Sequence, residues 1–199
     1  MRIYVMRHGQ TEENLRVAHT GWAHVPLTER GIAQAKGLRE RLYGLSFDKV
    51  IVSDLLRAQQ TAENALPNYD YQIDWRVREI HVGSLSGHSV KDCNKNFGAE
   101  YAKNRWERNF KPYGGENLNE LCSRVSQFMD DLTKEPEDAS IAVVCHEGAM
   151  IAMLMHVMQC DLNYLPAHAD NCSIAVFTYQ SGKWILNKWN EKGSLISER

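Results

Sequence analysis

The 199-residue sequence has few of the features that mark disulfide-rich, metal-binding or nucleic-acid-binding proteins. Its five cysteines are scattered singly without CxxC spacing, which argues against a disulfide framework and against a zinc site. The eight histidines show neither HxxH nor HExxH spacing, so we predict no metal and no other cofactor. The formal net charge of −2 gives no general affinity for polyanions, so neither nucleic acid nor a membrane surface is an expected partner.

Long apolar runs are also absent from the sequence. No run approaches the length of a membrane span, and the amino terminus "MRIYVMRHG" is too short and too soon charged for a signal peptide. We therefore expect a reduced, cytoplasmic protein. What the sequence does contain is 43% hydrophobic and 24% charged residues, the balance of an ordinary globular protein.

Predicted strands and helices alternate along the chain. Strand patterns occur at 2–6, 47–54 and 140–145, less clearly within 69–79, and as a hairpin over 173–189 that turns at Ser181-Gly182. Helical patterns occur at 27–44, 55–66, 117–134 and 149–158. Thr28 is a predicted N-cap, and Gly44 is a predicted stop for the same helix.

This alternation predicts an α/β fold, a three-layer sandwich with a mostly parallel central sheet and helices on both faces. The length fits a single domain over 1–199. Between about 80 and 115 the pattern weakens and becomes polar and basic. We expect short helices and loops there, forming a small helical insertion over the active site.

Unusual polar side chains stand where the predicted strands end. Arg7 and His8 follow the first strand, Arg57 lies one helical turn beyond the second, Glu79 follows the third, and His146 follows "SIAVVC". Because ligands of such sheets bind outside the carboxyl ends of the strands, these groups are expected to converge. Arginine grips a tetrahedral oxyanion bidentately, so the set predicts a phosphate site built without a metal.

The residue types also predict a reaction. An imidazole can attack phosphorus and form a covalent intermediate. Phosphoryl transfer mainly needs positioning and stabilisation of charge on the equatorial oxygens, which arginines and a protonated histidine supply. A carboxyl group can protonate the leaving oxygen and then activate water. A capping carboxylate and a surface ion pair are the alternatives for Glu79, and we favour the catalytic role.

The order of motifs resembles one known family. "RHGQTEEN", "TGWAHVPLTERGIAQA", "SDLLRAQQTA", "REIHVGSLSG", "YGGEN" and "VVCHEGAM" follow the order seen in the histidine phosphatase superfamily, the phosphoglycerate mutase-like proteins, and cover nearly the whole chain. The resemblance implies that His8 is the phosphorylated nucleophile, that Arg7, Arg57 and His146 form the phosphate clamp, and that Glu79 is the acid/base. Further predicted substrate-binding residues are Asn14, Thr20, Gly21, Gly148, Arg105 and Arg108.

The sequence departs from the family pattern at several positions. His24 stands where an aspartate is common, Leu85-Ser86 replace a tryptophan-glutamate pair, and Asn117 replaces a frequent serine. Glu147 replaces a frequent glycine after the second histidine. None of these changes removes a predicted catalytic group, but Glu147 is expected to narrow the pocket or to disfavour very acidic substrates.

The basic stretch over 101–113 leaves two interpretations open. It fits a solvated helix with Trp106 and Phe110 packed inward. It fits equally well the mouth of the active site, with Lys103, Arg105 or Arg108 reaching a second charged group on the substrate.

The mutases of this family transfer the phosphoryl group back to the substrate, and they typically carry a longer chain and an adjacent arginine pair in the insertion. The insertion here is compact, so we favour hydrolysis of small phosphomonoesters. A phosphoglycerate mutase-type phosphotransferase remains the alternative, as do α-ribazole phosphatase as the specific activity and a phosphatase for phosphoproteins. A non-catalytic binding module is a further alternative, although the chain keeps the nucleophile and the clamp. Oligomeric state is left open, and a homodimer is compatible with the sequence.

Overall fold

The computed structural model describes residues 1–159, 167–193 and 195. Over these residues a sheet of six strands has the order β3-β2-β4-β1-β5-β6. The strand bounds are β1 Arg2–Arg7, β2 Lys49–Val52, β3 Gln72–Ile73, β4 Ser140–Cys145, β5 Ile174–Gln180 and β6 Lys183–Glu191. Strands β3, β2, β4 and β1 pair in parallel, whereas β5 is antiparallel to β1 and to β6. The predicted α/β class and the hairpin turning at Ser181-Gly182 are both confirmed.

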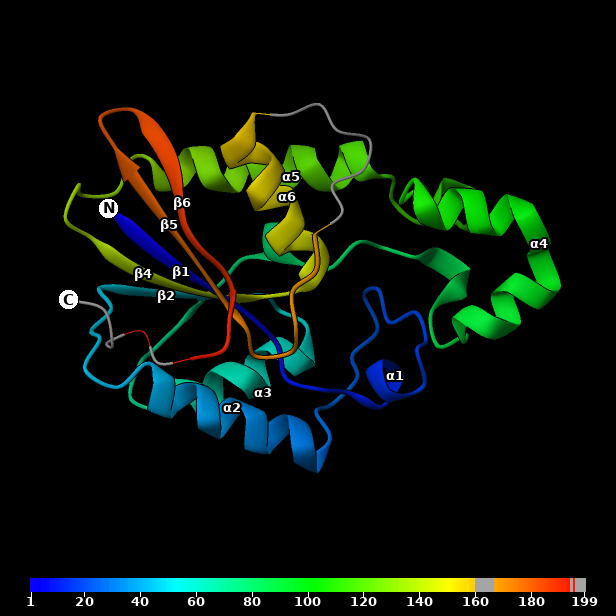
Figure 1. The fold of residues 1–199 in the computed structure, drawn as a ribbon, viewed down its shortest axis with the longest axis horizontal. Coiled ribbons are helices and arrows are strands. Elements are labelled where there is room, and N and C mark those ends of the chain that lie inside the picture. Colours follow the sequence, from blue (N-terminus) through cyan, green and yellow to red (C-terminus); the bar gives the residue numbers. More distant parts are fainter. Residues whose placement is uncertain (160–166, 194, 196–199) are drawn as a thin grey trace.

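Helices cover both faces of this sheet (Figure 1). The helices are α1 Glu12–Leu15, α2 Glu29–Arg41, α3 Leu56–Ala65, α4 Val90–Trp106, α5 Leu118–Leu132 and α6 Glu147–Met158. Figure 1 shows α2 and α3 on one face, α5 and α6 on the other, and α4 extending away from the sheet. The cap predicted at Thr28 is confirmed, because its Oγ1 accepts the Gly31 N–H at 3.0 Å.

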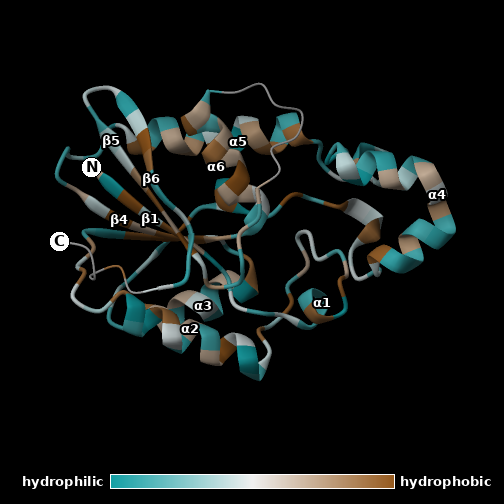
Figure 2. Ribbon diagram, in the orientation of Figure 1, coloured by the Kyte–Doolittle hydropathy of each residue, from teal (hydrophilic) through white to brown (hydrophobic). Residues whose placement is uncertain are grey.

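Strand β1 shows how the sequence builds two cores. Its alternate residues point to opposite faces. Ile3 and Val5 join the hydrophobic cluster that includes residues of α5 and α6, whereas Tyr4 and Met6 join the cluster that includes residues of α2 and α3. Figure 2 shows the corresponding hydrophobic band through the central strands. A strand buried on both faces is a rigid support for the residues that follow it.

The third predicted strand was wrong over most of its length. Only Gln72–Ile73 pairs with β2, and Trp75–Val77 forms a 3-10 helix. Asp74 ends the pairing because its carboxylate accepts the Arg76 N–H at 2.9 Å and caps the helical turn. Glu79 therefore lies in an irregular segment rather than directly at a strand end.

The segment after Ile80 contains a longer helix than expected. Helix α4 runs from Val90 to Trp106, with a kink at Gly98, where φ is 60°. The kink divides it into two shorter helical pieces, which is why the sequence pattern is weak there. None of the described helices combines the length and apolar character needed to cross a bilayer.

Candidate active site

The two predicted histidines lie side by side at the edge of the sheet. Strands β1 and β4 are parallel neighbours, with Arg7 opposite Cys145. The His8 N–H continues this ladder by donating to the Cys145 carbonyl at 3.0 Å. As a result, the His8 and His146 ring centroids are only 5.1 Å apart.

His8 presents its Nε2 atom to the site. Its Nδ1 lies 2.6 Å from its neighbour's carbonyl, Gly9 O, so Nδ1 carries the proton and Nε2 keeps its lone pair. Arg57 Nε donates to that Nε2 at 3.3 Å. The His8 side chain is only 3% exposed, and burial, followed by the charges of Arg57 and Arg7, holds its pKa well below the usual value. The imidazole is therefore neutral at physiological pH.

His146 makes its hydrogen bond within the protein through Nε2, the opposite ring nitrogen to that used by His8. Its Nε2 lies 2.8 Å from Ser53 Oγ, and that Oγ accepts the Leu55 N–H at 3.4 Å. This arrangement favours donation by the serine hydroxyl to Nε2 and a proton on Nδ1. The Nδ1 atom is buried and has no partner among the described residues. Burial, then the nearby Arg57 charge, lowers the His146 pKa well below its usual value.

Arg57 is a fully buried charge directed at His8. Besides the contact with His8, its guanidinium donates to Gly21 O at 2.8 Å and to Ala23 O at 3.0 Å. Burial lowers its pKa to about 10, so it stays charged at neutral pH. Backbone carbonyls rather than a carboxylate hold it in place, which leaves its positive charge available to an anion.

Arg7 is the second buried arginine of the site. Its Nη1 donates to Ala169 O at 2.5 Å and lies 3.3 Å from Glu147 Oε2. Its Nε is buried and has no partner among the described residues. An unpaired buried N–H is costly, so this atom is a ready donor for an anion beside His8.

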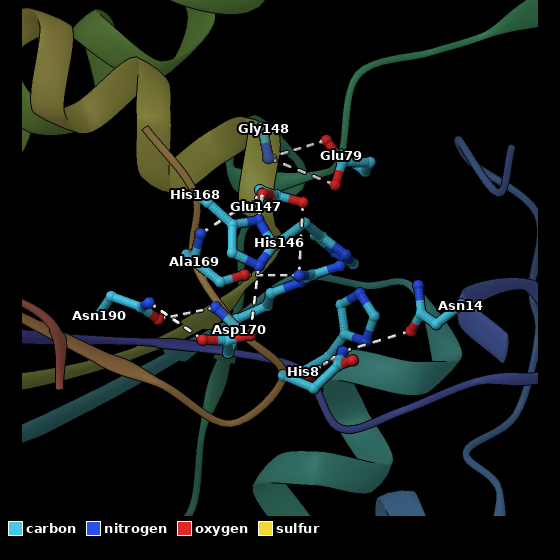
Figure 3. A network of polar contacts seen from close by, with 12 residues as sticks. His8, Asn14, Glu79, His146, Glu147, Gly148, His168, Ala169, Asp170 and Asn190 are labelled. Atoms are coloured by element: carbon cyan, nitrogen blue, oxygen red, sulfur yellow. Dashed lines mark hydrogen bonds and ion pairs between the residues drawn. The ribbon is translucent and has the colours of Figure 1, made fainter. Parts of the chain in front are cut away.

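Glu79 faces the histidines across the start of α6. Its Oε1 accepts N–H groups from Gly148 at 3.0 Å and from Ile80 at 2.8 Å, as Figure 3 shows in part. A Cβ on Gly148 would lie 2.1 Å from this oxygen, so only glycine leaves room for the carboxylate. Gly148 is a predicted substrate-binding residue, but its N–H is directed at Glu79.

Arg124 is a supporting residue that the sequence reading missed. It is 4% exposed and donates to the carbonyls of Arg76, Arg78 and Glu79 at 2.7 to 2.8 Å. Glu116 balances its charge through two contacts of 2.9 Å. A signal was present, since Arg124 lies three residues from Leu121 on the apolar face of α5. This arginine fixes the irregular segment that carries Glu79.

A cavity of about 630 Å³ opens in front of these groups. The predicted residues that line it are Arg7, His8, Asn14, Thr20, Gly21, Arg57, Glu79, Arg105, Arg108 and Gly148. His146 does not line the cavity and lies against the His8 ring. The polar lining residues that we did not predict include Glu13, His19, His168, Asp170 and Asn171.

The basic stretch contributes to the wall of this cavity. Phe110 is buried as expected, but Trp106 is 60% exposed and lines the cavity instead of packing inward. Arg105 and Arg108 line it as well, whereas Lys103 does not. This favours the interpretation of the stretch as part of the active-site mouth.

The departures from the family pattern have local roles. Ser86 donates to Thr20 O at 2.8 Å and holds the loop that lines the cavity. Leu85 is buried in the core, and Asn117 caps α5 through a reciprocal pair of bonds with Glu120. The pKa of Asp54 is lowered mainly by its hydrogen bond to Arg78, and His24 adds only a minor electrostatic contribution in the same direction. Glu147 lines the cavity beside Arg7.

Within the described ranges, no group of three metal-binding side chains is gathered in one place. The arrangement instead joins a neutral imidazole, two arginines, a second imidazole and a carboxylate. Such a set can attack an electrophilic phosphorus, hold its oxygens and move a proton.

The chain is similar to several known proteins. Residues 3–192 match the model of the histidine phosphatase superfamily, branch 1. The adenosylcobalamin/alpha-ribazole phosphatase of Escherichia coli is 32% identical, over 96% of this chain and 92% of that protein. The "Probable phosphoglycerate mutase GpmB" of Proteus mirabilis is 30% identical, over 95% and 90%. A mycobacterial glucosyl-3-phosphoglycerate phosphatase solved with VO3 superposes with a TM-score of 0.86 at 27% identity, over 96% and 99%.

Proposed function

The chain belongs to the histidine phosphatase superfamily, and we propose that it hydrolyses small phosphomonoesters through a phosphohistidine on His8. One observation carries the proposal. A neutral His8, with its Nδ1 on Gly9 O, has an unprotonated Nε2 beside Arg57 Nε and lines a cavity that Arg7 and Glu79 also line. That is the arrangement an in-line attack on a phosphate ester requires.

In the first step, His8 Nε2 forms a bond to phosphorus as the ester P–O bond breaks. Protonated Glu79 donates its proton to the leaving oxygen, which departs as an alcohol. We assign this proton to Oε2, because Oε1 accepts N–H groups at 2.8 and 3.0 Å, whereas Oε2 has only the longer contact of 3.3 Å with the Gly148 N–H. Arg7, Arg57 and the Nδ1–H of His146 stabilise charge on the three equatorial oxygens.

In the second step, water attacks the phosphohistidine while Glu79, now a carboxylate, takes a proton from that water. The N–P bond breaks, and inorganic phosphate leaves with His8 neutral again. The low pKa of His8 supports the first step, because the free enzyme keeps a neutral, nucleophilic imidazole that needs no deprotonation before attack.

The names of the relatives suggest two candidate substrates for this chain. The relatives named as α-ribazole phosphatases make α-ribazole phosphate a candidate, and the relatives named GpmB support phosphoryl transfer between phosphoglycerates as the second candidate function. Arg105 and Arg108 line the cavity and are placed to bind a second anionic group of a substrate. Phosphoglycerates carry such a group, so these two arginines favour the phosphoglycerate reaction.

Release of inorganic phosphate from para-nitrophenyl phosphate and a panel of phosphorylated metabolites, in EDTA, tests the proposal. We expect turnover by the wild-type protein and its loss in His8→Ala. Undiminished turnover in His8→Ala, or inhibition by EDTA that an added metal reverses, would contradict it. Without any turnover, phosphoglycerates with a bisphosphorylated primer would test the mutase, and binding alone would indicate a non-catalytic module.

A further inference from the structure

Glu147 is the first residue of α6, and its carboxylate is held at the cavity wall. Its Oε2 lies 3.3 Å from Arg7 Nη1, and its Oε1 lies 2.6 Å from His168 Nδ1. The Ala169 N–H also points at Oε1, at 3.4 Å. Figure 3 shows Glu147 and His168 together near the two site histidines. Three contacts therefore fix a negative charge beside the proposed phosphate site.

Arg7 places the negative charge of Glu147 next to the expected position of the ligand. It is 8% exposed, and its buried Nε has no partner in the described part of the chain. Such a donor marks the place of an incoming anion. A phosphate held by Arg7 brings the first atoms of its leaving group close to Glu147, because one guanidinium contacts both.

The charge of the cavity is divided between its walls. On one wall Glu147 is linked through His168 to Asp170, whose Oδ1 lies 3.2 Å from His168 Nε2. On another wall, Arg105 lies in the last turn of α4 and Arg108 lies just beyond the end of that helix. The acidic wall is the one that contacts Arg7.

The lining as a whole carries little spare positive charge. Its described residues include four arginines and three carboxylates, Glu13, Glu147 and Asp170, while Glu79 carries the proton that it gives up in the first step. Summed over the lining alone, a bound phosphate dianion makes this charge negative; Lys192 pairs with Asp170, so Glu147 is the carboxylate next to Arg7 that a ligand meets. A further carboxylate close to Glu147 would meet like-charge repulsion, which solvent screens only in part because the Glu147 side chain is 25% exposed.

We propose that Glu147 is a specificity-determining residue that selects phosphomonoesters with hydroxyl or amino groups next to the ester and rejects those with a carboxylate there. The inference rests on the proposed phosphatase function and deepens it. Hydroxyl and ammonium groups donate hydrogen bonds that the Glu147 carboxylate accepts, whereas a substrate carboxylate cannot donate.

Matched substrate pairs isolate this charge. Glycerol 3-phosphate differs from 3-phosphoglycerate, and phosphoethanolamine from phosphoserine, mainly by the carboxylate. The measured quantity is the ratio of kcat/KM within each pair, for wild type, Glu147→Gln and the control Glu12→Gln. Glu12 is exposed and lies outside the cavity lining, so its substitution makes the same change in net charge.

We expect the wild-type protein to prefer the carboxylate-free member of each pair. Glu147→Gln is expected to reduce that preference by roughly tenfold, the effect of one nearby charge in a partly screened site. Glu12→Gln should leave the ratio unchanged. An unchanged ratio in Glu147→Gln would overturn the inference. A wild-type preference for the carboxylates that disappears in Arg105→Ala would overturn it too, because the basic wall would then set specificity.

Binding separates this inference from the proposed function. Kd values for the same pairs, measured by calorimetry on His8→Ala with and without Glu147→Gln, do not require turnover. If no substrate is hydrolysed but the Kd ratio shifts with Glu147, the phosphatase proposal fails and the specificity role stands. If the esters are hydrolysed but neither ratio shifts, only the specificity role fails. If no ester binds, both are overturned.

Discussion

His8 and His146 occupy equivalent places at the ends of adjacent parallel strands, yet they present opposite nitrogens. His8 has Nδ1 on a backbone carbonyl and Nε2 beside Arg57, whereas His146 has Nε2 on Ser53 and Nδ1 unpartnered among the described residues. Both are buried, and both have a lowered pKa. The difference therefore comes from hydrogen bonding and not from burial. One ring is arranged to give an electron pair and the other to give a hydrogen bond.

Replacing each histidine by alanine in turn should produce the largest losses of activity. His8→Ala should lower kcat by about 10⁴-fold or more, because no other group forms the covalent bond. His146→Ala should lower kcat by about 10²- to 10³-fold, the usual loss for one donor to transition-state oxygens. Steady-state kinetics measure both values. Equal losses would mean that the two histidines do not have separate roles.

Glu79 can be displaced without altering either ring. In Gly148→Ala the new Cβ would meet Oε1 of Glu79 and push the carboxylate away. We expect kcat to fall by about 10- to 100-fold for alkyl phosphates, which need protonation of the leaving oxygen. Para-nitrophenyl phosphate has a good leaving group and should be less affected in its first step. Equal losses on both substrate types, compared in burst experiments, would contradict the assignment of the acid.

Ser53 tests the orientation of His146. Ser53→Ala leaves the buried Nε2 without a partner, so we expect a loss of about 1 to 3 kcal/mol in unfolding free energy and about tenfold in kcat. Ser173→Ala is the matched control, because its buried Oγ has no partner among the described residues. Denaturant unfolding together with kinetics would detect the difference. If Ser53→Ala resembled Ser173→Ala, Ser53 would not orient the ring.

The lowered pKa that His8 and His146 share should have a smaller, pH-dependent effect on the free energy of unfolding. Both pKa values are lowered from 6.5 in the folded chain, so the unfolded chain takes up these protons first as pH falls. The free energy of unfolding should therefore decrease below about pH 6.5, and less steeply in His146→Gln. Urea unfolding between pH 7.5 and 4.5 measures this. A slope that is identical in the variant would show that His146 is not buried as a neutral ring.

The parts of this site that the sequence could predict are those on regular strands. The buried runs "RIYVM" and "SIAVVC" specify β1 and β4, and the polar residues after them had to reach one rim. The position of Glu79 depends instead on Arg124, a charged residue from a distant helix that binds three carbonyls. Sequence periodicity does not report such long-range hydrogen bonds. The choice of ring nitrogens likewise depends on Ser53 and Gly9 O, which only three-dimensional geometry reveals.

The most direct test is to locate the phosphoryl group on the enzyme. Glu79→Gln mixed with para-nitrophenyl phosphate should form a phosphoenzyme, because this leaving group departs unaided, and hydrolyse it slowly, because the general base is missing. Alkaline quenching, peptide mass spectrometry and ³¹P NMR would then identify the modified atom. The predicted result is phosphate on Nε2 of His8. Phosphate on His146 or on Nδ1 of His8 would contradict the assignment of the nucleophile.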